Sequence, residues 1–285
     1  MTLRLRYLMS CLLIGYGLSI FAQSTKQYHA DGTACSAAHM QALIETNYPA
    51  LKQKQQALDD QTRREIYGPN PVSRVATVYS IPVVVHVVHF TGTAIGVNEN
   101  ITDAQIIQGI TDLNDAFRNI GFYDPATGVD VEIEFCLAAQ DELGNFTTGI
   151  TRTANNALTD LDSDTEDASL KSTALQWDPL RYCNIWLVDE ICSSGSGSCG
   201  TAGYAYLAGA HGQPYDGIVN EARFFGSSFN NSKVHIHEMG HYLNLRHTFQ
   251  GGCTNNNCTT DGDQVCDTPP DNATTAIPFE SVFNI

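Results

Sequence analysis

The sequence predicts an α+β fold in which helices pack against a mixed, twisted sheet. Three stretches support this prediction. Residues 81–90 (IPVVVHVVHF) are rich in valine and bounded by turn residues, which is typical of a strand buried on both faces. Residues 102–119 carry apolar side chains at helical spacing, and residues 237–247 (HEMGHYLNLRH) begin with two histidines four positions apart, as on one face of a helix. The length of 285 residues suits one such domain and a small extra segment.

The N-terminus has the pattern of a secretory signal peptide, which we assign to residues 1–22. Arg4 and Arg6 precede an apolar run over residues 8–21, and Ala22 suits a cleavage site. The run is too short for a stable membrane span. We therefore expect an exported, secreted protein with no stable membrane span.

Residues 23–77 are polar and favour helix, and we interpret them as a propeptide. The helical composition ends at residues 67–71 (YGPNP), where two prolines break both helix and sheet. A processing point near Arg74 is expected, with the dibasic pair at residues 63–64 as the alternative. The main domain then occupies residues 78–285.

The first helix of the main domain is expected over residues 102–119. Thr102 and Gln105 have the spacing of a capping box. Apolar and polar residues then alternate over residues 131–137, which predicts a half-buried strand.

Residues 160–167 hold five acidic side chains, for which a solvated acidic loop is favoured over a calcium loop because the glycine and terminal glutamate of an EF-hand are missing. Residues 181–188 predict a buried strand with Trp186 in the core. Residues 200–207 have the composition of an edge strand, and residues 216–221 are the last strand expected before the histidine-bearing helix.

The histidine-bearing helix is a candidate metal site. His237 and His241 project from one helical face, and Glu238 can reach a water on a metal held by that pair. His247 can meet the same metal only if the helix ends and the chain turns back, and Asn244 stands where that turn is needed. Three histidines and one open position are typical of catalytic zinc. The alternative is a buried amphipathic helix with incidental histidines.

These residues match the long HExxHxxGxxH motif, with Asn244 in place of glycine. HTFQGGC and then GDQVCDTPPD follow. With these segments the sequence resembles the pappalysin (pregnancy-associated plasma protein-A-like) family of metzincins over residues 86–271. The resemblance implies a metzincin-like catalytic domain with an edge strand over the cleft, a backing helix and a zinc helix. It also implies protein or peptide substrates.

The resemblance assigns three further roles. The edge strand would pair with extended substrate through Gly203, Tyr204, Ala205, Tyr206 and Leu207. Calcium would bind near Asp263, Asp267 and Thr268, where the alternative is a hydrogen-bonded turn that braces the third histidine. Cys35 would fill the fourth zinc position as a cysteine switch, although Ser36 stands where the family usually has glycine; the alternative is a disulfide.

Eight cysteines follow the signal peptide, in a compartment that permits disulfides. Cys192 and Cys199 flank a Ser/Gly-rich loop and could close it. Cys253, Cys258 and Cys266 crowd the segment after the zinc helix. The connectivity is not fixed by the sequence.

A C-terminally truncated member of the family is expected, with an incomplete lower subdomain. The last methionine is Met239, so no Met-turn follows His247. The sequence predicts a secreted zinc endopeptidase in which Glu238 acts as general base. The alternatives are an inert zinc-binding fragment and a secreted partner-binding module. The net charge of −16 argues against nucleic-acid binding.

Overall fold

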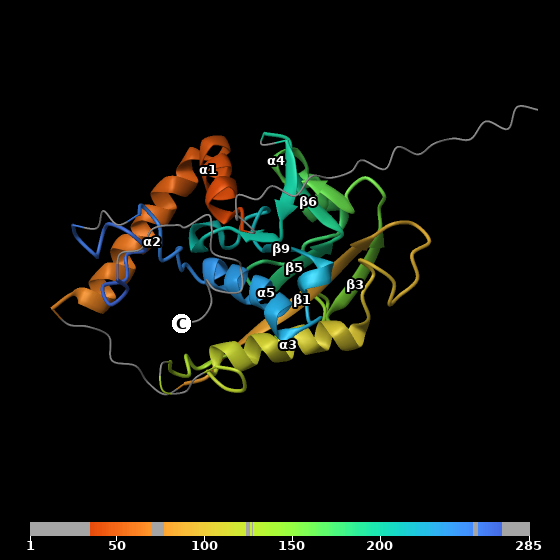
Figure 1. Cartoon of the computed structure of the whole chain (residues 1–285), viewed down its shortest axis with the longest axis horizontal. Coiled ribbons are helices and arrows are strands. Elements are labelled where there is room, and N and C mark those ends of the chain that lie inside the picture. The colour runs from red at the N-terminus through yellow and green to blue at the C-terminus, as the bar shows by residue number, and fades with distance from the viewer. Residues whose placement is uncertain are drawn as a thin grey trace, which may run out of the picture.

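The structure, a computed structural model, describes residues 35–69, 77–123, 126, 128–195, 197–252 and 256–269 (Figure 1). The predicted signal peptide, the predicted processing point at Arg74, and Cys253 lie outside these residues. So does the sequence from residue 270 onward, on which the expected truncation depends.

A mixed six-stranded sheet forms the centre of the fold, as the sequence predicts. Its order is β2-β1-β5-β9-β8, and β3 pairs with β1 beyond the end of β2. All pairings are parallel except that of β8 with β9, which is antiparallel and leaves β8 at the sheet edge. These strands are β1 (Tyr79–His89), β2 (Ile133–Leu137), β3 (Ile150–Ala154), β5 (Cys183–Val188), β8 (Gly203–Ala205) and β9 (Ile218–Glu221).

The valine-rich strand β1 is buried on both faces because its side chains alternate between two cores. Val83, Val85 and Val87 belong to one apolar cluster, and Val88 belongs to the cluster on the opposite face. His86 is buried and has a structural role, with its ring nitrogens hydrogen-bonded to side chains of neighbouring strands.

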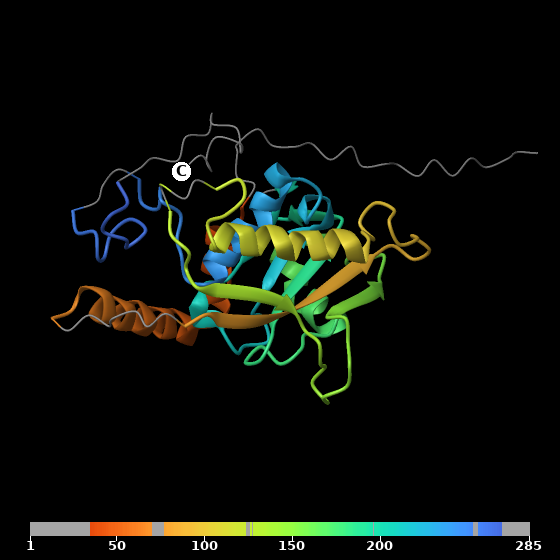
Figure 2. The ribbon, with the colours of Figure 1, turned by 90° about the horizontal axis from the view of Figure 1, so that it is seen from below.

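Helices α3 (Asp103–Phe117) and α5 (Phe229–Tyr242) cover one face of the sheet (Figure 2). Thr102 caps α3 by accepting a hydrogen bond from the backbone N–H of Gln105. The Gln105 side chain does not complete a capping box, because its amide donates to the carbonyl of Phe225 instead. That contact ties α3 to the turn that precedes α5.

The opposite face is covered by α4 (Ser163–Thr173), and beside it lies a small sheet of β4 (Asp160–Asp162), β6 (Glu190–Ser193) and β7 (Ser198–Thr201). The prediction of a solvated acidic loop over residues 160–167 is therefore wrong. Asp162 caps α4, where a carboxylate suits the free N–H groups and the positive end of the helix dipole. Asp167 is buried because Lys171 neutralises it.

The predicted propeptide is helical, as expected, and packs on the edge-strand side of the domain. Helix α1 (Ala37–Asn47) buries Met40 and Ile44 in the cluster that also contains Tyr204 and Tyr206. Helix α2 (Pro49–Tyr67) runs on beside the segment that follows α5 (Figures 1 and 2). Within the described residues, no helix has both the length and the apolarity that a membrane crossing requires.

Candidate metal centre

Helix α5 presents two of the candidate ligands on one face. It begins at the cap residue Ser228, whose hydroxyl accepts the backbone N–H of Asn231. His237 and His241 follow one turn apart, and the centroids of their rings are 4.6 Å apart. A third histidine of the helix, His235, points elsewhere: its Nε2 hydrogen-bonds the carbonyl of Gly109 on α3.

The turn after α5 brings the third histidine back to the helix. Asn244 adopts a left-handed conformation with φ 79°, as the sequence predicts for this position. The backbone N–H of Asn244 donates to the carbonyl of His241, and that of Leu245 donates to the carbonyl of Gly240. These bonds satisfy carbonyls at the helix end and reverse the chain, so that His247 faces the helix.

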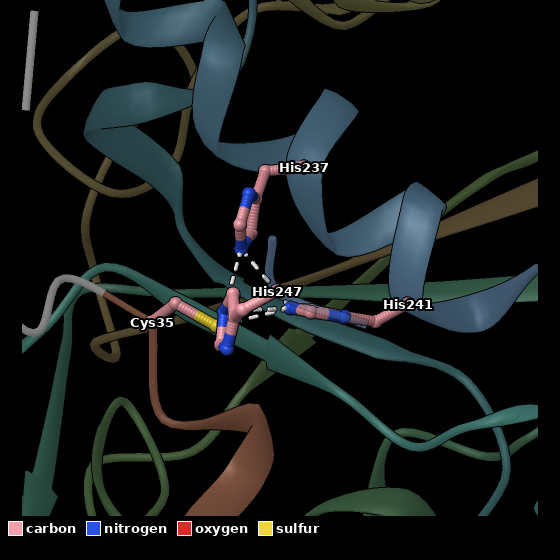
Figure 3. Close-up of side chains that lie close together, drawn as sticks. All are labelled: Cys35, His237, His241 and His247. Carbon is pink, nitrogen blue, oxygen red and sulfur yellow. Dashed lines mark hydrogen bonds between the residues drawn. The ribbon is translucent and has the colours of Figure 1, made fainter. Parts of the chain in front are cut away.

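The three Nε2 atoms converge on one point. Their separations are 3.0 Å between His237 and His241, 3.1 Å between His237 and His247, and 3.1 Å between His241 and His247 (Figure 3). Three nitrogens bound to one tetrahedral zinc ion at about 2.0–2.1 Å would lie roughly 3.3 Å apart. The three nitrogens are therefore close enough together to hold one zinc ion.

The surroundings of the three histidine rings favour their neutral form, which is the form that binds metal. The Nδ1 of His241 lies 2.8 Å from the carbonyl of Leu245, and a proton on that nitrogen leaves Nε2 free to bind. Burial lowers the pKa of His241, and it lowers that of His247 to about 4. Burial and the two neighbouring rings hold the pKa of His237 well below its usual range. Neutral imidazoles are the form that binds zinc.

Glu238 lies next to Cys35, under the edge strand. It is buried, and its carboxylate is hydrogen-bonded by the backbone of Ala205 and by the thiol of Cys35, whose sulfur lies 3.7 Å from Oε2. Burial raises its pKa to about 8. A Cβ on Gly203 would lie 3.0 Å from Cγ of Glu238 and 2.5 Å from Nδ2 of Asn220, so only glycine lets the edge strand approach this closely.

Cys35 completes the cluster from the predicted propeptide (Figure 3). Its sulfur lies 3.4 Å from Nε2 of His241, and the four candidate ligand atoms lie within 4.8 Å of one another. The backbone N–H of Ala37, at the start of α1, donates to the sulfur at 3.4 Å. Cys35 is a free cysteine in the described structure, and its role as a switch stays a prediction.

The predicted propeptide also lies along the edge strand that was predicted to receive substrate. Cys35 forms a parallel bridge with Gly203, and the N–H of Ser36 donates to the carbonyl of Gly203 at 3.2 Å. Strand β8 is shorter than predicted, because Tyr206 and Leu207 lie beyond its end at Ala205.

Two glutamines of the predicted propeptide accept hydrogen bonds from backbone N–H groups beyond β8, and the sequence analysis did not identify them. The side-chain oxygen of Gln41 accepts the N–H of Leu207 at 3.1 Å, and that of Gln55 accepts the N–H of Gly209 at 2.8 Å. Glutamine is common in polar helices, so the sequence carries no signal for these contacts.

The other predicted site residues have simpler outcomes. Cys192 and Cys199 form the expected disulfide, and Cys258 pairs with Cys266. The calcium prediction for Asp263, Asp267 and Thr268 stays a prediction. The carboxylate of Asp263 is buried and accepts the N–H of Val265 at 3.0 Å, which agrees with the alternative of a hydrogen-bonded turn, and Asp267 is exposed.

A mixed sheet with an antiparallel edge strand, together with three histidines converging from a helix and the turn after it, defines the metzincin class of metalloproteases. Solved structures agree. A glutamate-to-alanine mutant of promirolysin from Tannerella forsythia is 27% identical, with a TM-score of 0.62, and the match covers 84% of this chain and 76% of that one. Mature mirolysin from the same organism, in complex with a cleaved peptide, is 30% identical with a TM-score of 0.55, covering 71% of this chain and 74% of that one.

The family model described as pregnancy-associated plasma protein-A matches residues 164–283. The chain belongs to the pappalysin family of metzincins. An extracellular metalloprotease of Verticillium alfalfae is 56% identical over 43 residues, 15% of this chain and 13% of that protein. One of Pyricularia oryzae is 30% identical over 119 residues, 37% of this chain and 36% of that protein. The chain thus spans well under half the length of these curated relatives.

Proposed function

We propose that the protein is a secreted zinc metalloendopeptidase in its latent form. The observation that carries the proposal is the convergence of three histidine nitrogens and the Cys35 sulfur within 4.8 Å of one another, with the buried carboxylate of Glu238 3.7 Å from that sulfur. The family membership and the extracellular metalloproteases among the relatives support both the chemistry and the location.

His237, His241 and His247 would hold the zinc ion. When bound, zinc supplies a Lewis acid for the scissile carbonyl and lowers the pKa of a coordinated water to about 7. Glu238 is within reach to take a proton from the attacking water and return it to the leaving amine, which contributes roughly a hundred- to ten-thousand-fold to the rate. The positive charge of a zinc ion held by these neutral histidines would favour the carboxylate form that this role requires. Protein or peptide substrates would lie along β8 and hydrogen-bond its free backbone groups.

Cys35 would keep the protein latent. Its sulfur lies where a fourth ligand would bind, and a thiolate is a good zinc ligand that excludes water from that position. The donor to the sulfur, the N–H of Ala37, stabilises negative charge there. Processing between α2 and β1 would then release residues 35–67 and open the cleft.

The test of the active site compares metal content with cleavage. Glu238→Ala should retain one zinc per chain and lose casein cleavage after processing, because the ligands remain and the proton acceptor is gone. Glu134→Ala removes an exposed carboxylate on β2 and should change neither property. Full activity in Glu238→Ala would refute its role, and a wild-type chain that binds zinc but cleaves nothing would reduce the protein to a zinc-binding fragment.

The test of latency uses the unprocessed chain. Cys35→Ala should be active without processing, whereas Cys136→Ala, which removes an exposed free cysteine, should stay latent. Cobalt substitution gives a readout that does not depend on activity, because a thiolate–cobalt(II) bond has its own absorption band. A band that persists in Cys35→Ala would exclude Cys35 as the ligand.

A further inference from the structure

Arg246 stands directly before the third histidine and pairs with a carboxylate of the propeptide. Its guanidinium lies 2.5 Å from Oδ2 of Asp59 on α2. Both side chains are mostly buried, at 13% and 10% exposure, so the pair is shielded from solvent. An ion pair in such a position contributes more than an exposed one, because less solvent screens it.

The turn supplies a second donor to the same carboxylate. The Nδ2 of Asn244 donates to Oδ1 of Asp59 at 3.2 Å, and the remaining donor, Nε2 of Gln55 at 2.8 Å, belongs to the propeptide itself. Two donors therefore stay on the main domain when the propeptide leaves. Within the described residues, Arg246 forms its ion pair with Asp59. When the propeptide leaves, the guanidinium therefore loses its counter-charge.

Arg246 faces the cleft. It lines a cavity of about 90 Å³ together with His241, His247, Ala205 and Leu207, and the propeptide helix α1 closes that cavity. A peptide that replaced the propeptide along the edge strand would pass the guanidinium. The backbone N–H of Leu207, now taken by the propeptide, would become available to the same peptide.

We propose that Arg246, assisted by Asn244, forms a carboxylate-binding subsite of the processed enzyme, and that Asp59 occupies it in the latent form. The subsite selects substrates with Asp or Glu at the position that lies beside Leu207. The proposal rests on the proposed protease function. The whole chain, with a net charge of −16, repels acidic peptides at long range, but salt at physiological strength screens that repulsion beyond about 8 Å.

The test uses the full protein after processing and removal of the propeptide, at physiological salt. Fluorogenic peptide pairs differ only by Glu or Gln, and the substitution is moved through the positions that flank the cleaved bond. At one position we expect kcat/KM to be about tenfold higher for Glu, because a hydrogen bond to a charged group contributes about that factor. Arg246→Gln should bring the ratio close to one, and Arg118→Gln, which removes an exposed arginine charge, should leave it unchanged.

Equal cleavage of Glu and Gln peptides by the wild type at every position would overturn the subsite, even if Arg246→Gln failed to fold. A preference that survives in Arg246→Gln would overturn it as well. The same peptide pairs are titrated calorimetrically into processed Glu238→Ala, which separates binding from cleavage. If Glu peptides bind more tightly than Gln peptides but the wild type cleaves neither, the protease function is refuted and the subsite is retained. If Glu and Gln peptides bind Glu238→Ala equally, the subsite is rejected.

Discussion

A buried ion pair supports the edge strand from behind, and its removal is a test of how the cleft is held. The ammonium of Lys171 lies 2.8 Å from Asp167 and donates to the carbonyl of Tyr215 at 2.6 Å. The hydroxyls of Tyr204 and Tyr206 donate to the two oxygens of Asp167 at 2.7 and 3.1 Å. Burial, and then the charge of Asp167, raise the pKa of both tyrosines well above the usual range, so they remain donors.

Lys171→Met keeps most of the alkyl chain and removes the charge, which leaves Asp167 buried without its cation. Losing one partner of a buried pair costs about 3–5 kcal/mol, and the two tyrosine donors that remain place the expected loss near the lower end, about 3 kcal/mol. The free energy of unfolding is measured by urea denaturation, followed by tryptophan fluorescence. Lys52→Met, on the exposed face of α2, should change it by less than about 0.5 kcal/mol.

The double variant Lys171→Met/Asp167→Asn decides whether charge compensation is the cause. Asn still accepts a tyrosine hydroxyl but carries no charge, so the double variant should be more stable than Lys171→Met alone. The single variant Asp167→Asn completes the comparison. If the losses in unfolding free energy of Lys171→Met and Asp167→Asn add up to that of the double variant, the two side chains are not energetically coupled and the reasoning fails.

Two further predictions concern single residues. Burial lowers the pKa of His86 to about 4 in the folded protein, below the usual 6.5, so the unfolded chain binds the proton first and stability falls as the pH drops. From pH 7 to pH 5 this group should remove about 2 kcal/mol of the free energy of unfolding, and a His86→Gln variant with an unchanged pH dependence would contradict it. The variant Gly203→Ala should still bind zinc but lose at least about tenfold in kcat/KM, because the new Cβ pushes the edge strand away from Glu238. Zinc analysis and peptide cleavage measure the two properties. An unchanged cleavage rate would contradict the prediction.

Local patterns predicted the elements whose cause is local. The burial of Val83, Val85 and Val87 follows from an unbroken apolar run, and the cap at Thr102 follows from a side chain that reaches its own helix. The left-handed turn at Asn244 follows from the conformations that one residue type tolerates. The convergence of His247 on the helix follows from that turn.

The sequence-based predictions failed where a residue distant in the sequence lowers the free-energy cost of burying a charged side chain. Five acidic residues in eight predict a solvated loop as long as their charges are considered alone, but Lys171 and two tyrosines compensate Asp167 and allow a helix to pack there. The alternation that begins at Val131 forms a strand only from Ile133, because Glu132 has φ 60°.

The sequence by itself predicted which residues form the candidate metal site, because their spacing on one helix and its turn is a local property. It also determined that the first segment is helical and polar. Only the tertiary structure decided that this segment places a sulfur among the histidines, and that Asp59 rests on Arg246 across 187 positions of the chain. Contacts at such separation depend on how the layers pack, and no periodicity within either segment records them.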